Sequence, residues 1–175
     1  MHVYIERWWG EYIGGTDDTY SLMDYLTERG FQQDRPVEIE LTTIMQDFRL
    51  TMARGIEDIR QTIDVYYTFE EGFHADIGCA VNLLMDVTAI LVECQKNGQV
   101  CLMELVGTNQ KEAVIIVKAG QEALLLLKNR MEDFIQHPLK YDLADFCPED
   151  EMHTIAEQCK EMITELSIGS RRGEV

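Results

Sequence analysis

The amino-acid sequence predicts a single α+β domain, in which a small, mainly antiparallel sheet packs against a central buried helix and further amphipathic helices. Three observations support this fold class. The segment from Ala75 to Asn97 carries apolar residues around most of a helical circumference, as a buried central helix does. Residues 100–106 and 113–118 have the composition of strands, and their short connection favours an antiparallel hairpin. The predicted strands and helices do not alternate regularly, unlike those of a doubly wound parallel sheet.

The N-terminal segment, residues 2–9, is predicted to be a short strand because Val3 and Ile5 alternate and have aromatic neighbours. Successive side chains of a strand point to opposite faces, so Trp8 and Trp9 would lie on different sides. One would anchor the core, and the other, close to acidic residues, is a candidate hot spot for a partner. The alternative is that both tryptophans pack within the fold, because each can bury a large area.

Helix signals follow this strand. Thr16-Asp17-Asp18 can cap free amides and place negative charge in a first turn, which predicts a helix that ends at Gly30. Residues 36–48 carry both an alternating pattern and helical spacing, and we favour a helix from about Thr42. The next segments are predicted to be a loop at residues 51–62 and a strand at residues 63–69.

Further helices are predicted around and after the hairpin of residues 100–118. Within the central helix, Asn82, Asp86 and Glu93 fall in one narrow sector, which predicts a solvent-facing polar stripe. A further helix is expected from about Gln121 to Gln136, where Pro138 stops it, and a last helix begins at Pro148. The whole is expected to be one domain over residues 1–168 with a frayed tail at residues 169–175.

The net charge is the main functional signal. Thirty-two acidic residues face fifteen basic ones, so the net charge is −17, and no acidic tail accounts for it. Such a surface repels phosphate backbones and anionic membranes, so we expect neither nucleic acid nor a membrane as a partner. It attracts basic proteins and speeds encounter with them. The alternative is that the acidity serves only solubility.

The cysteines and the N-terminus indicate a cytoplasmic location. The number of cysteines is odd, and Cys79, Cys94 and Cys159 fall on apolar faces of predicted helices while Cys101 falls in a predicted strand. We interpret them as small buried hydrophobic residues in a reducing compartment. The N-terminus lacks the basic-then-apolar pattern of a signal peptide, and no apolar run approaches the length of a membrane span.

One cluster, made of Glu70, Glu71, His74 and Asp76, has residue types suited to metal binding or acid–base chemistry. Its spacing matches no metal signature, and it lies where turn and cap residues are expected. A metal-assisted hydrolase that uses this cluster is therefore an alternative function. The favoured interpretation is a protein without catalytic residues, metal or cofactor.

The block from Trp8 to Asp18 and the helix that follows it resemble small acidic bacterial immunity proteins, as do the size and acidity of the chain. The resemblance implies a non-catalytic cytoplasmic inhibitor that binds a basic cognate toxin, such as a nuclease, and occludes its active site. It assigns no binding residues in this chain. A structural or regulatory interaction module, which could form a homodimer, is the other binding class left open.

Two acidic clusters are the predicted partner-binding residues, because neither has basic neighbours in the sequence apart from Lys160. The apolar residues of the same elements face away, so these carboxylates should be exposed to solvent. Uncompensated exposed acids repel one another, and this cost suggests a use in binding. The clusters comprise Glu11, Asp17 and Asp18 before and at the first predicted helix, and Asp150, Glu157, Glu161 and Glu165 on the last helix.

Overall fold

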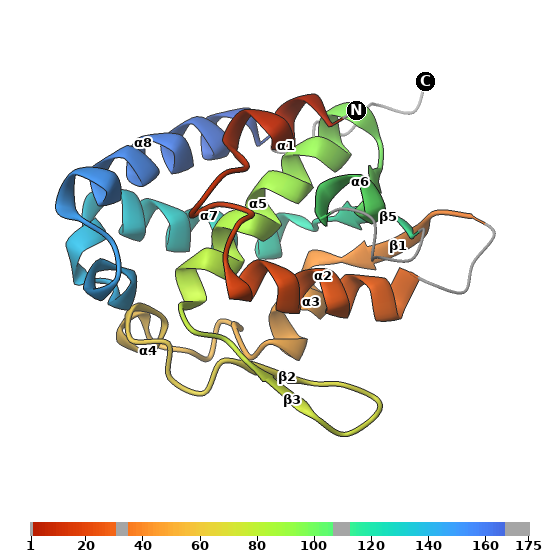
Figure 1. The fold of residues 1–175 in the computed structure, drawn as a ribbon, viewed down its shortest axis with the longest axis horizontal. Coiled ribbons are helices and arrows are strands. Elements are labelled where there is room, and N and C mark those ends of the chain that lie inside the picture. The colour runs from red at the N-terminus through yellow and green to blue at the C-terminus, as the bar shows by residue number, and fades with distance from the viewer. Residues whose placement is uncertain (1, 31–34, 107–112, 167–175) are drawn as a thin grey trace.

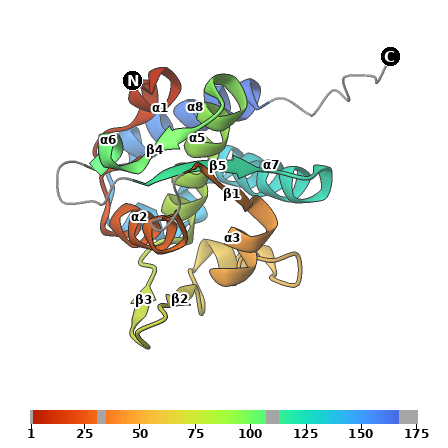
Figure 2. The same cartoon turned by 90° about the vertical axis from the view of Figure 1, so that its right-hand side faces the viewer.

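The computed structural model describes residues 2–30, 35–106 and 113–166, and within these ranges it confirms the α+β class. Helices pack around the first of two small sheets (Figures 1 and 2). The first sheet has the order β1 (Val37–Glu40), β5 (Val114–Lys118) and β4 (Val100–Cys101), with β1 parallel and β4 antiparallel to β5. The second sheet is an antiparallel hairpin of β2 (Tyr66–Thr68) and β3 (His74–Asp76).

The central helix is α5 (Ala80–Asn97), and its predicted burial is confirmed. Every residue from Ala80 to Cys94 is buried, and the helix contacts α1, α2, α7, α8 and β5. The helix begins at Ala80 rather than at Ala75, because residues 74–76 pair with β2. Its C-terminal cap is Gly98, whose φ of 91° is readily accessible only to glycine.

The strand predicted at residues 2–9 is wrong, because this segment is the short helix α1 (Val3–Trp8). The carboxylate of Glu93 on α5 accepts hydrogen bonds from the backbone N–H groups of Tyr4 and Ile5, at 2.8 and 2.9 Å. These are first-turn amides that have no partner within the helix. Ile5 and Trp8 are both buried, and their separation of three residues places them on one helical face.

The predicted polar stripe of the central helix is also not exposed: Asn82, Asp86 and Glu93 are all buried. The carboxylate of Asp86 accepts hydrogen bonds from the backbone N–H of Gly14, at 2.8 Å, and from the hydroxyl of Thr19, at 2.6 Å. The stripe therefore faces the N-terminal part of the chain and holds it against α5. Glu93 holds α1, and Asp86 holds the segment from Gly14 to Thr19. Burial raises the pKa of Asp86 to about 7.

Helix α2 (Asp17–Gly30) follows the prediction closely. The side chains of Thr16 and Thr19 bond reciprocally to one another's backbone N–H groups, at 3.3 and 3.2 Å, which caps the first turn. Leu22 and Leu26 are completely buried against the core, as the helical spacing predicts.

Both patterns read in residues 36–48 are present, because β1 leads directly into α3 (Leu41–Asp47). The segment predicted to be a loop contains the one-turn helix α4 (Ile56–Arg60). The strand predicted at residues 63–69 is confirmed as β2, although it is shorter. The β2–β3 hairpin projects from the rest of the molecule in both views (Figures 1 and 2).

The C-terminal half agrees with the prediction except at residues 102–106. These form α6 (Leu102–Val106), so only the first two residues of the predicted strand pair with β5. The bounds of α7 (Gln121–Gln136) are those predicted, and two 3-10 helices, η1 (Pro138–Lys140) and η2 (Asp142–Asp145), lead to α8 (Glu149–Glu165). The predicted connection at residues 107–110 and the predicted tail lie outside the described residues.

Four of the five cysteines are buried, and all five are free thiols. Burial raises the pKa of Cys79 to about 12 and that of Cys94 to about 11. Burial also raises the pKa of the completely buried Cys159. Protonated buried thiols act as small hydrophobic residues, which is the role that the sequence predicted for Cys79, Cys94 and Cys159.

Candidate functional site

Of the first predicted acidic cluster, Glu11 lies beside α8, the helix that carries the second cluster. The loop that carries Glu11 packs beside α8, and a shallow pocket of about 160 Å³ separates them. Glu11 and Tyr12 line it from the loop, and Glu151 and Thr154 line it from the helix. The sequence alone could place the second cluster on the last helix but could not show that the loop with Glu11 is its neighbour.

The expectation that these clusters lack basic neighbours is wrong for Glu161 and Glu165, in the C-terminal part of α8. Arg7 of α1 forms an ion pair with Glu161 at 3.0 Å and approaches Glu165 at 3.9 Å. Lys96 of α5 forms a second ion pair with Glu165, at 3.3 Å. Glu157 approaches Lys160 at 3.7 Å. The negative charge of α8 is therefore reduced by residues that are distant in the sequence.

Asp18 does not belong to the exposed surface, because only 5% of it is accessible to solvent. Its carboxylate accepts hydrogen bonds from the backbone N–H groups of Gly78 and Cys79, at 2.6 and 2.9 Å, and from the side-chain amide of Asn82, at 2.9 Å. Asp18 therefore joins the start of α2 to the start of α5. Its neighbour Asp17 is exposed, as predicted.

Both tryptophans pack against the core. Trp8 is the last residue of α1, and Trp9 follows it directly. Trp8 is 3% exposed, and its ring N–H donates to Glu161 at 3.3 Å. Trp9 is half-buried, and its ring covers Gly14 so closely that a Cβ atom there would lie 1.9 Å from it. Trp9 is therefore the tryptophan that is more accessible to a partner.

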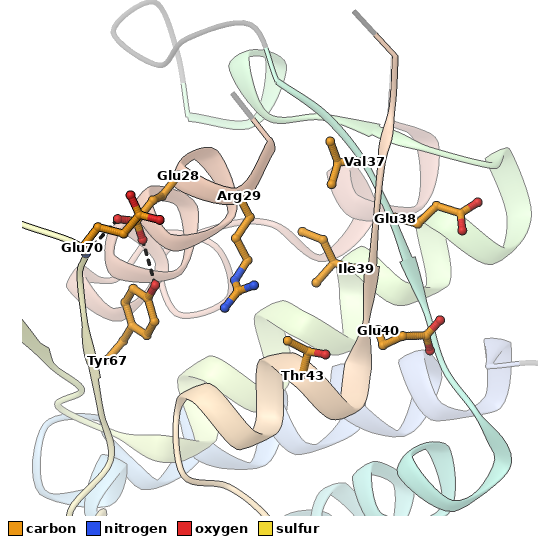
Figure 3. Close-up of a pocket in the computed structure, with 9 residues that line it drawn as sticks. All are labelled: Glu28, Arg29, Val37, Glu38, Ile39, Glu40, Thr43, Tyr67 and Glu70. Carbon is orange, nitrogen blue, oxygen red and sulfur yellow. Dashed lines mark hydrogen bonds between the residues drawn. The ribbon is translucent and has the colours of Figure 1, made fainter. Parts of the chain in front are cut away.

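A larger acidic pocket lies on another part of the molecule, between α2, β1, α3 and the β2–β3 hairpin (Figure 3). Its volume is about 460 Å³. We call it the acidic pocket, because four carboxylates and one guanidinium are among the groups that line it. Its lining residues are Glu28, Arg29, Val37, Glu38, Ile39, Glu40, Thr43, Tyr67 and Glu70.

Glu28 is held in one orientation at the wall of the acidic pocket (Figure 3). One carboxylate oxygen accepts a hydrogen bond from the Tyr67 hydroxyl at 2.8 Å, and the other accepts one from the backbone N–H of Glu70 at 3.0 Å. Both donors are neutral, so the negative charge of Glu28 remains. Burial and the hydrogen bond to Glu28 raise the pKa of Tyr67 to about 12, which keeps its hydroxyl protonated.

The cations near the acidic pocket neutralise little of its charge. Arg29 points into the pocket in Figure 3, but its guanidinium bonds to Asp47, and it lies over the ring of Tyr25 at 4.8 Å. Lys118 forms an ion pair with Glu38 at 2.5 Å. Among the residues that the structure describes, Glu40 and Glu70 have no basic partner. The pocket is therefore a concave site with excess negative charge.

The residues of the alternative metal cluster lie on the hairpin beside this pocket. Among the described residues, no group of three or more His, Cys, Asp and Glu residues could hold a metal ion. His74 instead bonds through its ring to the Thr68 hydroxyl at 2.8 Å and packs edge-on against Tyr66. At the tip of the hairpin, the ring of Phe73 is 54% exposed and stacks on Phe69.

Sequence reasoning missed most of the acidic pocket. Glu28, Glu38 and Glu40 were not singled out, and Glu70 was weighed only as a metal ligand. Glu28 and Glu70 each lie in a long stretch without lysine or arginine, but their helix and hairpin meet only in the folded chain. A second signal is the alternation in β1, which places Glu38 and Glu40 on the face opposite Ile39.

Comparison with known proteins gives one match. A protein-family model described as Immunity protein 68 matches residues 4–166. No curated protein and no solved structure matches the chain. The matched range contains the acidic pocket and both predicted acidic clusters. In the part of the chain that the structure describes, no helix is long and apolar enough to cross a bilayer.

Proposed function

Because the chain belongs to the Immunity protein 68 family, we propose that it binds a cognate toxin in the cytoplasm and blocks that toxin's active site. The family supports an immunity role in general. Our proposal adds a surface and a partner chemistry: the acidic pocket receives basic side chains of the toxin. The observation that carries it is a concave site in which Glu28, Glu40 and Glu70 have no cationic partner among the described residues.

A basic toxin fits this site for electrostatic reasons. A cleft lined by charge of one sign concentrates the field and raises the rate at which an oppositely charged protein associates. Toxins that cleave nucleic acid need basic residues to bind phosphate groups, and those same residues would complement the acidic pocket. The net charge of −17 would orient the approaching toxin before contact, and would repel nucleic acid that competes for it.

The β2–β3 hairpin extends this surface. It forms one wall of the acidic pocket through Tyr67 and Glu70 and carries the exposed ring of Phe73 at its tip. Aromatic side chains that become buried are frequent hot spots of protein interfaces. We therefore include Phe73 in the proposed contact, as an apolar group at the edge of an acidic site.

The acidic face of α8 remains a second proposed contact surface. Glu11, Asp150 and Glu157 are exposed there, whereas Glu161 and Glu165 already have cationic partners within the chain, and the exposed Asp17 lies on α2. We rank this face below the acidic pocket, because its pocket is smaller and its charge is partly neutralised. A single experiment can compare the two surfaces.

The experiment measures binding to the toxic domain encoded next to the gene of this chain, inactivated by mutation so that it can be produced. In the double variant Glu40→Lys/Glu70→Lys, we expect the association rate to fall by about tenfold or more at low salt. We also expect its dependence on salt to become weaker. Both carboxylates are exposed and form no ion pair with a described residue, so the thermal midpoint should change little.

Two single variants separate the alternatives. Glu157→Lys changes an exposed residue of α8 and reports on the second surface. Glu132→Lys changes an exposed residue of α7 and serves as the control for altered net charge. If Glu157→Lys slows association and the pocket variant does not, the acidic pocket is not the contact. If the wild-type chain does not bind the toxic domain at physiological salt, the proposed function is wrong.

A further inference from the structure

Strand β1 forms one edge of its sheet, because β5 lies between β1 and β4. All four residues of β1 line the acidic pocket, although side chains of a strand point alternately to two faces. Figure 3 shows this alternation, with Val37 and Ile39 on the side of Arg29 and with Glu38 and Glu40 on the opposite side. A pocket that touches all four residues follows an edge of the strand. Since β5 occupies the other edge, the acidic pocket opens along the unpaired edge of β1.

The unpaired edge presents peptide groups that a partner can use. Within the described ranges, β1 pairs with no strand other than β5. In a parallel ladder, alternate residues direct their N–H and C=O groups away from the neighbouring strand. These groups can accept an added strand, and an extended segment of another protein is a common partner of such an edge.

The charges along this edge define what the added strand carries. Glu38 and Glu40 are exposed on one face of β1, and Glu28 and Glu70 lie across the pocket from its other face (Figure 3). Side chains directly opposite one another in paired strands lie roughly 5 Å apart, within reach of an ion pair. A segment with lysine or arginine at alternate positions would therefore place them opposite Glu40 and opposite Glu38, which Lys118 neutralises in part.

The same charges argue against a second copy of this chain as the partner. Pairing two β1 edges would place Glu38 and Glu40 of one copy close to the same residues of the other. Like charges opposite one another destabilise a strand pair. The acidic edge therefore selects a basic strand and disfavours self-association.

We propose that the toxin adds an extended, basic segment to the unpaired edge of β1, so that backbone hydrogen bonds fix it and the carboxylates of the acidic pocket select it. This inference rests on the proposed function, because it specifies how the toxin occupies the acidic pocket. It differs from docking of side chains alone, in which the peptide groups of β1 would remain bonded to water.

Amide hydrogen exchange and NMR of the isotope-labelled chain, free and bound to the inactivated toxic domain, test the proposal. In the free protein, the amides of β1 that face away from β5 should exchange rapidly. In the complex, their exchange should slow by more than about tenfold, and backbone contacts between β1 and a toxin segment should appear as intermolecular NOEs. Amides of α7, which carries neither proposed contact surface, serve as the internal control within the same sample.

The outcomes separate this inference from the proposed function. A complex in which the side chains of Glu40 and Glu70 change environment while the outward amides of β1 exchange as in the free protein would overturn strand addition alone. A mixture in which no complex forms would overturn the proposed function together with this inference. The variant Glu40→Lys should weaken the NOEs and the protection together, because the charge and the strand edge act on the same segment.

Discussion

Replacing the buried carboxylate of Asp86 with an amide, in the variant Asp86→Asn, should remove a pH-dependent destabilisation of the fold. Asp86 is completely buried, and its two oxygens accept hydrogen bonds from Gly14 and Thr19. Asparagine has the same shape. Its oxygen can accept from the Gly14 N–H, and its amide can donate to the Thr19 hydroxyl, so both contacts survive the substitution.

The magnitude follows from the pKa of Asp86, which burial raises from 3.8 to about 7. Below about pH 4, the carboxyl group is protonated in the folded and unfolded states, and its titration has no effect on stability. Between about pH 4 and pH 7, the folded protein keeps a proton that the unfolded chain has lost, so the free energy of unfolding falls as the pH rises. At 1.36 kcal/mol per pKa unit, this loss amounts to about 4 kcal/mol above pH 7.

Urea unfolding of the wild type and of Asp86→Asn across this pH range measures the effect. The difference in unfolding free energy should be small near pH 4 and should grow to as much as about 4 kcal/mol in favour of Asp86→Asn near pH 8. Other groups titrate in both proteins, so their contribution cancels in the difference between the two unfolding free energies. A difference that stays constant between pH 4 and pH 8 would refute the assignment of a raised pKa to Asp86.

Four further substitutions test contacts in the fold. Asp18→Ala should lower the free energy of unfolding by about 3 kcal/mol in denaturant titration, because it leaves buried amides at the start of α5 without an acceptor. Gly14→Ala should lower the free energy of unfolding by more than about 2 kcal/mol, since Gly14 has a φ of 80° and lies against the Trp9 ring. Its control is Gly10→Ala, where the added Cβ would meet no atom within 4 Å, and which should change stability by less than about 1 kcal/mol. Arg7→Ala should cost less than about 1 kcal/mol, because its ion pairs with α8 are half-exposed; a larger loss would show that they stabilise the fold.

The sequence was sufficient to predict those elements whose signals are local. Helix α7 lies between Gly120 and Pro138, and its apolar residues recur at helical spacing, so both of its ends could be predicted. The helical nature of α1 could not be predicted. Its first-turn amides are satisfied by Glu93, which lies nearly ninety residues away and which the helical pattern places on a solvent-facing stripe. A polar residue on an otherwise apolar helix faces either water or a buried partner, and the sequence of the helix does not distinguish the two.

The acidic surface shows the same limit. Counting basic neighbours along the chain could not detect the pairing of Arg7 with Glu161 or of Lys96 with Glu165, because these pairs form only when α1, α5 and α8 pack together. The acidic pocket brings Glu28 and Glu70 together from α2 and the hairpin in the same way. Total charge and the absence of a catalytic pattern were enough to predict a binding protein, whereas the location of the excess charge required the fold.

The structure of the chain in complex with the inactivated toxic domain tests the central claim most directly. We predict that at least one lysine or arginine of the toxin lies within 4 Å of the carboxylates of Glu28, Glu40 or Glu70, a distance at which an ion pair forms. We also predict that an extended toxin segment runs beside β1. A complex in which the acidic pocket stays open to solvent, with the toxin bound to α8 or to another face, would contradict the claim.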